Sequence, residues 1–379
     1  MNDSSIPTSA EVIVVGGGLV GMAVAYGLAK AGTKTLVLDQ GDDAFRASRG
    51  NFGLVWVQGK GFDRLEYSRW TRSSALAWAG LAEDLLQETD VDVRLKQPGG
   101  FHMCFSDQEL AERQARLAGM QAGLSDYPFE MLDRADLRAR LPGIGPKVVG
   151  ASYTPMDGHV NPLKLLRALH AGAQHHGATI LGRMPVERID SAPGEFTVVT
   201  PGQRFTAPRL VLAAGLGNRP LGEQVGLHAP VAPNRGQVLV SERVRPFLDY
   251  PTINVRQTDE GSVQLGDSME EVGFNDLTTT DVLARIAQRG VNTFPLLADV
   301  RLVRAWGALR VMSPDGYPIY QESASHPGAF VVTCHSGVTL AAAHATRIAP
   351  WVRGGEHPEE LAVFAGERFL TGEVFSHAH

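Results

Sequence analysis

One stretch near the beginning of the chain, residues 11–39, constrains the fold more than any other part. An apolar run at 12–15 leads directly into a turn that holds three spaced glycines, and an apolar-rich helical pattern follows. A second apolar run at 35–38 then ends on Asp39. Strand, glycine turn, helix, strand and acid, in this order and at this spacing, are typical of a unit that binds a dinucleotide.

The glycines and the start of the helix each have a physical reason to be there. Gly16 permits the tight turn out of the strand, Gly18 leaves room for a pyrophosphate against the backbone, and Gly21 lets the helix pack closely on the sheet. The free N–H groups at the helix start, around Leu19 and Val20, carry the positive end of the helix dipole. We therefore expect the phosphates to lie over this turn.

The acid at the end of the second strand indicates which kind of ribose is bound. Asp39, which Gln40 follows, can accept hydrogen bonds from a free ribose hydroxyl, whereas a 2′-phosphate would favour an arginine. FAD and NAD share this half of the molecule, so the motif alone leaves both open. A glycine turn in an α/β protein that binds nothing is the alternative interpretation.

Composition excludes several classes of protein. The chain has 379 residues, 44% hydrophobic and 20% charged, which predicts a globular protein of two domains. The net charge of −6 argues against a nucleic-acid binder. Cys104 and Cys334 are too few for a disulfide framework or a zinc site, so we expect no metal centre and a reducing, cytoplasmic compartment. Residues 1–10 lack signal-peptide features, and no stretch is apolar enough to span a membrane.

The order of the predicted elements indicates a discontinuous architecture. Rossmann-like α/β segments occur at the start, middle and end of the chain, with β-rich and helical insertions between them. The fold class we predict is α/β, with a Rossmann-like nucleotide-binding domain interrupted by a mixed-sheet α+β substrate domain. The nucleotide-binding domain is predicted to comprise 1–85, 145–228 and 320–379, and the substrate domain 86–144 and 229–319.

Helices are predicted from apolar periodicity and from capping residues. Asn161 is a good N-cap and Pro162 fits the first helical position of a helix that follows. The other predicted helices cover 68–88, 107–121, 133–141 and 279–297, and a closing helix follows a glycine loop after a strand near 329–333.

Seven segments together resemble a known family. They are VVGGGLVGMAVAYGLAKAG…LVLD, ASRGNFG, YTPMDGHVNPLKLLRAL, LVLAAGLGNRPL, PVAPNRGQ, WGALRVMSPDGYPI and CHSGVTLAAAHA. In this order they resemble the D-amino-acid oxidase and glycine oxidase family of FAD enzymes, which includes the sarcosine oxidases. Two of them are most similar to the smaller catalytic subunits of heteromeric opine- and sarcosine-type dehydrogenases.

The resemblance implies FAD as the cofactor, and a second glycine segment points the same way. The strand, glycine loop and helix around 330–345 can hold the flavin end, because a helix N-terminus stabilises the negative charge of a reduced flavin. Further flavoprotein contacts implied by the family pattern are Ser48, Asn51 and Gly53 near the pyrophosphate and flavin, Val186 at the adenine, Ala214 and Gly215 at a second tight corner, and Gly337, Val338, Thr339 and Leu340 at the flavin.

Five residues are predicted to take part in substrate binding or catalysis. Arg310, in WGALR, matches the arginine with which the family holds a substrate carboxylate through its planar fork. Trp306 can line the pocket beside it, although a tryptophan on a strand is more often part of the core. Met269 matches a flavin-facing position where some oxidases have a lysine that assists oxygen chemistry. Asn254 falls where some relatives have an aromatic substrate contact, and His335 can form a hydrogen bond near the flavin.

Two further residues are predicted to have no catalytic part. Lys60 lies between two glycines in VQGKG, which is typical of a solvated turn. Cys334 precedes His335, but no third partner for nucleophilic catalysis is visible, so we expect a structural thiol.

The resemblance implies oxidation of the C–N bond of an amino acid or N-substituted amino acid by hydride transfer to flavin, with no essential general base. Its partners would be an amino-acid-like small molecule and other subunits of a heteromeric dehydrogenase. Two alternatives stay open at this point: a nicotinamide-dependent hydroxy-acid dehydrogenase, and a flavin-bearing subunit that is structural in a larger redox complex.

Overall fold

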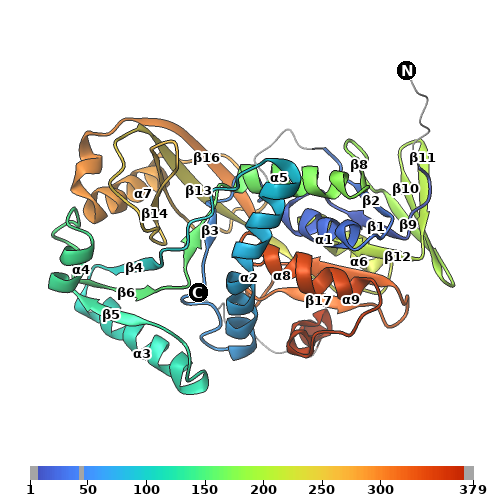
Figure 1. Ribbon diagram of the computed structural model, residues 1–379, viewed down its shortest axis with the longest axis horizontal. Helices are drawn as coiled ribbons and strands as arrows, with labels where there is room; N and C mark the ends of the chain where they lie inside the picture. Colours follow the sequence, from blue (N-terminus) through green and yellow to red (C-terminus); the bar gives the residue numbers. More distant parts are fainter. Residues whose placement is uncertain (1–6, 42–46, 371–379) are drawn as a thin grey trace.

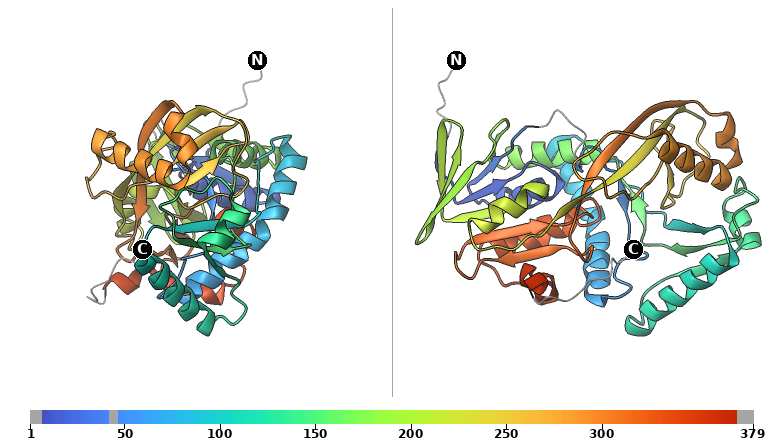
Figure 2. Two further views of the ribbon diagram at one scale, coloured as in Figure 1. Left: turned by 90° about the vertical axis from the view of Figure 1, so that its left-hand side faces the viewer. Right: turned by 180° about the vertical axis from the view of Figure 1, so that it is seen from behind.

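The computed structural model describes residues 7–41 and 47–370. The described chain forms an elongated molecule with two parts side by side, and α2 (Leu65–Thr89) runs between them (Figures 1 and 2). The prediction about a signal peptide concerns residues 1–10, of which residues 1–6 lie outside these ranges.

A six-stranded sheet forms the centre of one part. Its order is β17-β18-β12-β1-β2-β8, and all neighbours are parallel except the edge strand β17, which is antiparallel to β18. The inner strands are apolar and fully buried, as expected for a parallel sheet covered on both faces. The strands are β1 (Val12–Val15), β2 (Thr35–Leu38), β8 (Thr179–Leu181), β12 (Arg209–Leu212), β17 (Ile319–Glu322) and β18 (Ala329–Thr333).

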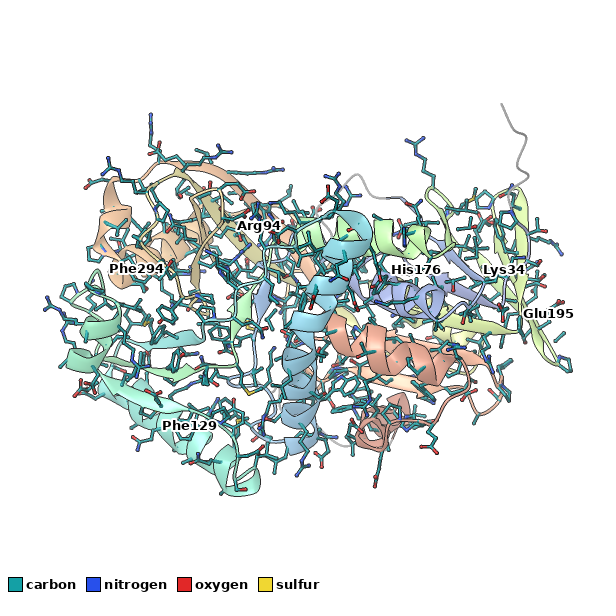
Figure 3. The ribbon with its side chains drawn as sticks, in the orientation of Figure 1. Lys34, Arg94, Phe129, His176, Glu195 and Phe294 are labelled. Carbon is teal, nitrogen blue, oxygen red and sulfur yellow. The ribbon has the colours of Figure 1, made fainter. Side chains whose placement is uncertain are left out.

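Short elements complete this part. An antiparallel meander of β9 (Arg188–Ala192), β10 (Glu195–Thr200) and β11 (Gln203–Ala207) stands at the far end, where Figure 3 labels Glu195. The helices are α1 (Leu19–Lys30), α5 (Pro162–His175), α6 (Asn218–Glu223), α8 (Ala341–Ala343) and α9 (Ala349–Val352), with a π-helical turn at His344–Ile348 and 3₁₀ turns at Gly215–Gly217, Glu359–Phe364 and Gly366–Leu370.

The other part contains two antiparallel sheets, and Figure 3 labels Phe294 and Phe129 within it. One has the order β14-β15-β13-β16 and is covered by α7, while the other has the order β4-β6-β5 with α3 and α4 beside it. Its elements are β4 (Gly100–Cys104), α3 (Asp107–Gly123), β5 (Glu130–Asp133), α4 (Arg134–Arg140), β6 (Gly150–Thr154), β13 (Ala232–Arg243), β14 (Val255–Gln257), β15 (Ser262–Leu265), α7 (Thr280–Thr293), a 3₁₀ turn at Pro295–Asp299 and β16 (Leu302–Met312). A two-stranded ribbon of β3 (Leu54–Val55) and β7 (Gly158–His159) lies near the junction.

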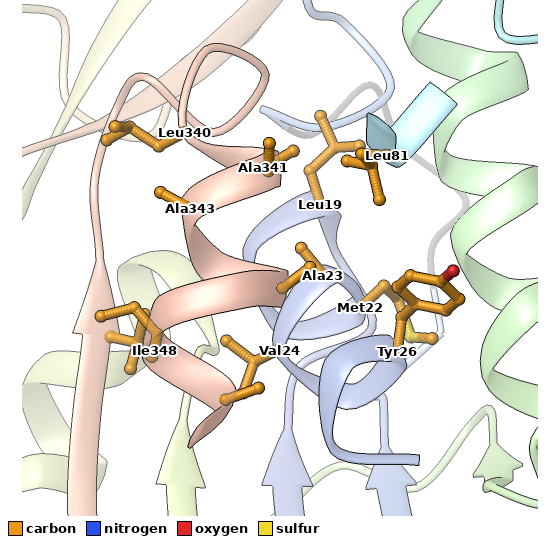
Figure 4. Close-up of a cluster of buried hydrophobic side chains, with 14 of the residues drawn as sticks. Leu19, Met22, Ala23, Val24, Tyr26, Leu81, Leu340, Ala341, Ala343 and Ile348 are labelled. Carbon is orange, nitrogen blue, oxygen red and sulfur yellow. The ribbon is translucent and has the colours of Figure 1, made fainter. Parts of the chain in front are cut away.

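Close packing around α1 positions the glycine turn. Figure 4 shows Ala23 and Val24 of α1 on the side of Ala341 and Ile348 of the C-terminal segment, while Met22 lies beside Tyr26. A side chain at Gly27 of α1 would overlap the backbone of the π-helical turn, so the two helices approach almost to backbone contact. The two glycine segments predicted to bind a cofactor are therefore neighbours in the core.

The predicted elements agree with the structure in kind, and the α/β fold class is confirmed. Asn161 caps α5 by accepting hydrogen bonds from the amides of Leu163 and Lys164. The helix predicted over 279–297 ends at Thr293, because Pro295 cannot continue the α-helical hydrogen bonds, and a 3₁₀ turn follows.

The predicted domain boundaries stay a proposal. The six-stranded sheet gathers strands from the beginning, middle and end of the chain, as a discontinuous domain requires. However, β6 shares a sheet with β4 and β5, although the boundary predicted between residues 144 and 145 separates them.

No helix within the described residues is long and apolar enough to cross a membrane.

Candidate active site

A cavity of about 900 Å³ is lined by residues from both parts of the molecule. Its walls come from the segment that leads into β3 and the turn after it, from α2 and α3, from β4, β13 and β16, and from the loop that follows β18. Of the predicted substrate residues, Arg310, Met269 and His335 line it, and so do Asn51, Val338 and Thr339 of the predicted cofactor residues.

The first glycine turn has no room for side chains. Gly16 has a φ of +111°, and a Cβ there would overlap the carbonyl of Ala213 at the end of β12. A Cβ at Gly21 would overlap the carbonyl of Gly16, and one at Gly18 would lie 2.8 Å from Ser48 Oγ. Backbone carbonyls therefore exclude a larger residue at Gly16 and Gly21, whereas at Gly18 the close neighbour is only the side chain of Ser48.

Two other predicted segments meet the start of α1. Ser48 Oγ accepts a hydrogen bond from the amide of Leu19 at 2.9 Å. A Cβ at Gly337 would lie 3.4 Å from Val20 Cγ2, so the second glycine loop packs on the same helix turn. The structure thus brings these segments together at the helix N-terminus, where the dipole favours an anion.

Asp39 orders the turn beside it. One carboxylate oxygen accepts the amide of Gly17 at 2.7 Å and the other accepts the amide of Gly41 at 2.9 Å. Gln40, next to it, is exposed. Val186 is half-buried and packs against the apolar cluster on the β9–β11 side of the sheet.

The second tight corner follows β12 and lies next to the first. A Cβ at Gly16 would lie 3.0 Å from Ala214 Cα, and Gly215 has a φ of +60°. The amide of Ala214 donates to Asn218 Oδ1 at 2.7 Å. Asn218 is fully buried and its Nδ2 has no protein partner among the described residues, a donor that the sequence did not single out.

Thr339 connects the second glycine loop to the segment around β3. Its hydroxyl accepts the amide of Trp56 at 3.1 Å and donates to the carbonyl of Leu54 at 3.3 Å. Its own carbonyl accepts hydrogen bonds from Ser74 and Trp78 of α2. Leu340 is fully buried beside it. Segments almost 300 residues apart are thereby held in one wall of the cavity.

The segment between Ser48 and β3 forms another part of that wall. Asn51 Oδ1 accepts the amide of Gly53 at 2.7 Å. Gly53 has a φ of +90°, and a Cβ there would lie 2.6 Å from the carbonyl of Val160. The backbone therefore turns sharply at this point, which only glycine permits without strain.

Arg310 projects from β16 at the cavity wall, with its guanidinium held on two sides. Nη1 donates to the carbonyl of Ser268 at 2.8 Å and to Asn234 Oδ1 at 3.2 Å, and Nη2 forms an ion pair with Asp267. A Cβ at Gly236 on the neighbouring strand β13 would overlap this guanidinium. The arginine is thus fixed in one orientation and is still partly exposed to the cavity.

Two predicted pocket residues lie elsewhere. Trp306 is not among the residues that line the cavity, and its indole Nε1 donates to the carbonyl of Gly50 at 3.1 Å. Asn254 does not line it either, whereas its neighbour Ile253 does. The backbone carbonyl of Asn254 instead accepts the amide of Gly266. Trp306 shares a face of β16 with Arg310 but lies further along the strand, against Gly50, which itself lines the cavity. The roles predicted for Trp306 and Asn254 stay predictions, without support from the cavity lining.

The prediction that Lys60 is solvated is wrong. Lys60 is half-buried in the cavity wall, and its Nζ lies 3.0 Å from both His335 Nε2 and Ser336 Oγ. Burial lowers the pKa of this ammonium to about 8. Cys334 is half-buried, and burial raises the pKa of its thiol to about 12, as expected of an unreactive, structural cysteine.

A buried polar network behind the cavity was not predicted. Asp157 is fully buried and accepts the amide of Val57 and the side-chain amide of Gln58, at 2.6 and 2.7 Å. Gln58 Oε1 in turn accepts hydrogen bonds from Arg113 and Ser152. Burial outweighs these donors and raises the pKa of Asp157 to about 7. The sequence signal was only an Asp-Gly dipeptide, which is typical of a surface turn.

The described residues fit FAD. The glycine cradle at the start of α1 suits a pyrophosphate, Asp39 suits a ribose, and the buried donor on Asn218 lies at the neighbouring corner. Val338 and Thr339, of the loop predicted to hold the flavin, line the same cavity as Arg310 and Lys60. No cluster of His, Cys, Asp or Glu side chains that could hold a metal ion occurs within residues 7–41 and 47–370.

Comparisons with known proteins also indicate an enzyme that uses FAD. A family described as DAO, FAD dependent oxidoreductase, matches residues 11–351. The chain is 42% identical over 361 residues to one of the subunits of opine oxidase from Agrobacterium tumefaciens (strain Ach5), covering 95% of this chain and 97% of that protein. The opine oxidase subunit of the same name from Rhizobium meliloti is 40% identical over 362 residues, with 95% and 97% covered.

The fold has relatives among solved structures. Glycine oxidase from Geobacillus kaustophilus superimposes with a TM-score of 0.89 at 24% sequence identity, covering 94% of this chain and 98% of that one. The nicotinamide alternative left open by the first glycine motif is therefore wrong. The chain belongs to the DAO family of FAD-dependent oxidoreductases, and FAD is its cofactor.

Proposed function

We propose that this enzyme oxidises the C–N bond of an amino acid or N-substituted amino acid. The observation that carries the proposal is the fixed guanidinium of Arg310 in the wall of the same cavity that the second glycine loop lines. An arginine fork binds a carboxylate through two charge-assisted hydrogen bonds. A substrate held by its carboxylate at Arg310 would present its α-carbon and nitrogen toward that loop.

The protein's own contribution would be binding and orientation. Arg310 fixes one end of the substrate, and the apolar wall formed by Trp56, Leu54 and Val338 excludes water from the other. FAD, when bound, supplies the redox chemistry by accepting a hydride from the carbon attached to nitrogen. Water then hydrolyses the resulting imine to a carbonyl compound and an amine.

The far end of the cavity supports an N-substituted substrate with a second acidic group. Arg113, Arg116 and Arg289 line the cavity there, with Glu109 and Glu112 beside them. The relatives named as opine oxidase subunits suggest the substrate class, since opines join an amino acid to a keto acid through one nitrogen and so carry two carboxylates. One carboxylate would bind at Arg310 and the other near the arginines of α3.

We further propose that the chain works in a complex with other polypeptides. Support comes from the relatives, which are named as subunits, and from Met269, which lines the cavity at the position where the family resemblance associates a lysine with oxygen chemistry. Native purification should recover additional polypeptides, and the isolated chain should reduce an artificial dye faster than oxygen. Rapid turnover of a monomer with oxygen alone would contradict this.

Product analysis tests the reaction. The holoenzyme and an electron-accepting dye should be incubated with glycine, sarcosine, iminodiacetate and N²-(1-carboxyethyl)arginine. Oxidation of iminodiacetate should yield glyoxylate and glycine in equal amounts. The dye should accept two electrons for each molecule of iminodiacetate oxidised. A hydroxy acid such as lactate is the matched control. If lactate is oxidised and none of the amines is, the proposed substrate class is wrong.

A further inference from the structure

Lys60 is held at a fixed point of the cavity by its backbone. It lies in the turn between β3 and α2, flanked by Gly59 and Gly61 with φ values of +86° and +84°. The amide of Lys60 donates to the carbonyl of Val57 at 3.0 Å. A Cβ at Gly61 would lie 2.6 Å from the amide of Ser68, so this turn packs directly on the first turns of α2.

The ammonium of Lys60 has only neutral partners. Nζ contacts His335 Nε2 and Ser336 Oγ, and Ser336 Oγ also accepts the hydroxyl of Tyr67 at 2.9 Å. No carboxylate of the described part of the chain lies within ion-pair distance of Lys60. Lys30 and Lys164, by contrast, both pair with acids. A buried cation without a counter-ion loses a proton readily.

The two neutral partners accommodate either protonation state of Lys60. A charged Lys60 donates one N–H to His335 Nε2 and another to Ser336 Oγ. A neutral Lys60 can instead accept a hydrogen bond from the N–H of His335 Nε2, because imidazole carries its proton on either nitrogen. Lys60 can therefore remain in contact with His335 and Ser336 in either protonation state.

Charged groups from several elements surround this lysine. The pKa of Lys60 is lowered to about 8, mainly by burial and also by Arg310, while Cys334, Asp267 and Asp157 oppose the shift. The titratable and charged groups nearest to it include His335 and Cys334 after β18, Tyr67 on α2, Asp63 in its own turn, Asp157 before β7, Asp267 after β15 and Arg310 on β16. The same cavity is also lined by His102 and Cys104 on β4, by Glu109, Glu112, Arg113 and Arg116 on α3, and by Arg289 and Tyr317.

We propose that Lys60 accepts the proton of the substrate's ammonium nitrogen before oxidation. This rests on the proposed function, since an amine expels a hydride from its carbon only when the nitrogen lone pair is free. The substrate N–H bond breaks, an Nζ–H bond forms on Lys60, and the electron pair stays on the substrate nitrogen. The proton then passes to His335 or to solvent, and no further oxidant or reductant is needed.

Competitive labelling measures how readily Lys60 loses its proton, and it does so without any substrate turnover. The holoenzyme is treated with trace acetic anhydride across a pH series, and peptide mass spectrometry compares Lys60 with the exposed Lys147. Labelling of Lys60 should level off above about pH 8, roughly two pH units below a lysine of ordinary pKa. A midpoint as high as that of Lys147, or no labelling at any pH, would contradict an accessible, readily deprotonated lysine.

Kinetics of three variants separates proton acceptance from mere positive charge. Lys60→Met should lower kcat/KM for iminodiacetate about 10²-fold at neutral pH, and the deficit should shrink as pH approaches the pKa of the free amine. Lys60→Arg keeps the charge but cannot release a proton, so it should show the same deficit. Lys147→Met should match the wild type, and flavin content should confirm that each variant folds.

The outcomes distinguish this inference from the proposed function. Full activity of Lys60→Arg at all pH values overturns proton acceptance and leaves amine oxidation intact. A deficit in Lys60→Met that is constant with pH overturns it as well. If the wild-type holoenzyme oxidises none of the amines in the panel, the proposed function fails, even where labelling still finds Lys60 readily deprotonated.

Discussion

Arg310 and Asp267 form an ion pair at the wall of the cavity, so the arginine proposed to bind the substrate already contacts a carboxylate of the protein. The side chain of Asp267 is 40% exposed, and that of Arg310 is 22% exposed. Solvent reaches the pair, which limits its strength. A substrate carboxylate would therefore compete with Asp267 for the same guanidinium.

Removal of the arginine tests the carboxylate site. Arg310→Ala should lower kcat/KM by about two to three orders of magnitude, because a bound carboxylate is left without its cation. Arg310→Lys should recover only part of the lost kcat/KM, since the point charge of lysine does not replace the two-pronged guanidinium of arginine. Flavin content should stay normal. Arg188→Ala, in the distant β9, is the control. Wild-type kcat/KM in Arg310→Ala would place the carboxylate elsewhere.

Removal of the competing acid should have the opposite effect. Asp267→Asn should lower KM for iminodiacetate by up to about fivefold, because an exposed ion pair is worth less than about 1 kcal/mol. The value of kcat should change little. A higher KM in this variant would mean that Asp267 orients Arg310 rather than competing with the substrate.

Three glycine substitutions, two at the start of α1 and one in α2 as a control, test the cofactor turn. Gly21→Ala puts a Cβ into the carbonyl of Gly16 and should reduce both FAD content and thermal stability. Gly18→Val should block the cofactor more selectively, because its neighbour is the side chain of Ser48. Gly80→Ala meets no atom within 4 Å and should stabilise α2 by about 0.5–1 kcal/mol. Full FAD content in Gly18→Val would move the phosphates away from this turn.

The hydroxyl of Thr339 should contribute to stability. Thr339→Val removes the acceptor of the buried amide of Trp56, which should cost about 1–3 kcal/mol in the free energy of unfolding. Thr346→Val, whose hydroxyl bonds a carbonyl of its own helix at an exposed position, serves as the control. Urea denaturation of both variants measures the difference. Equal denaturation midpoints for the two variants would show that water can take the place of the Thr339 hydroxyl as hydrogen-bond acceptor.

Asp157 should make stability depend on pH in an unusual direction. Its pKa is about 7 in the folded protein, compared with about 3.9 in an unfolded chain, so the folded state binds the extra proton between these values. The free energy of unfolding should therefore fall as pH rises from about 4 to about 7. Asp157→Asn should flatten this slope in urea titrations. An unchanged slope would mean that titratable groups other than Asp157 cause the pH dependence of the free energy of unfolding.

The sequence was most informative where a local pattern and a local structure coincide. The turn at Gly16, Gly18 and Gly21, the acid at Asp39 and the cap at Asn161 are recognisable because their constraints act over a few residues. Lys60 was misjudged because its burial depends on His335 and Ser336, 275 and 276 residues away. No pattern within VQGKG carries that contact.

Strand positions near the cavity were predicted only in part for a related reason. Arg310 and Trp306 lie on the same face of β16, as their spacing requires. Only Arg310 lines the cavity, because Trp306 lies further along the strand and contacts Gly50 from another segment. The network of Asp157, Gln58 and Arg113 likewise joins three distant segments. Such groupings depend on how the sheets pack, which periodicity does not encode.

The central claim is that this flavoprotein removes a hydride from a carbon attached to nitrogen. Anaerobic mixing of the holoenzyme with iminodiacetate, either unlabelled or deuterated at its methylene carbons, tests it most directly. The account predicts that the visible absorbance of the oxidised flavin disappears, and that deuteration slows its disappearance. An absorbance that persists with every amine of the panel, or that lactate removes instead, would contradict the account.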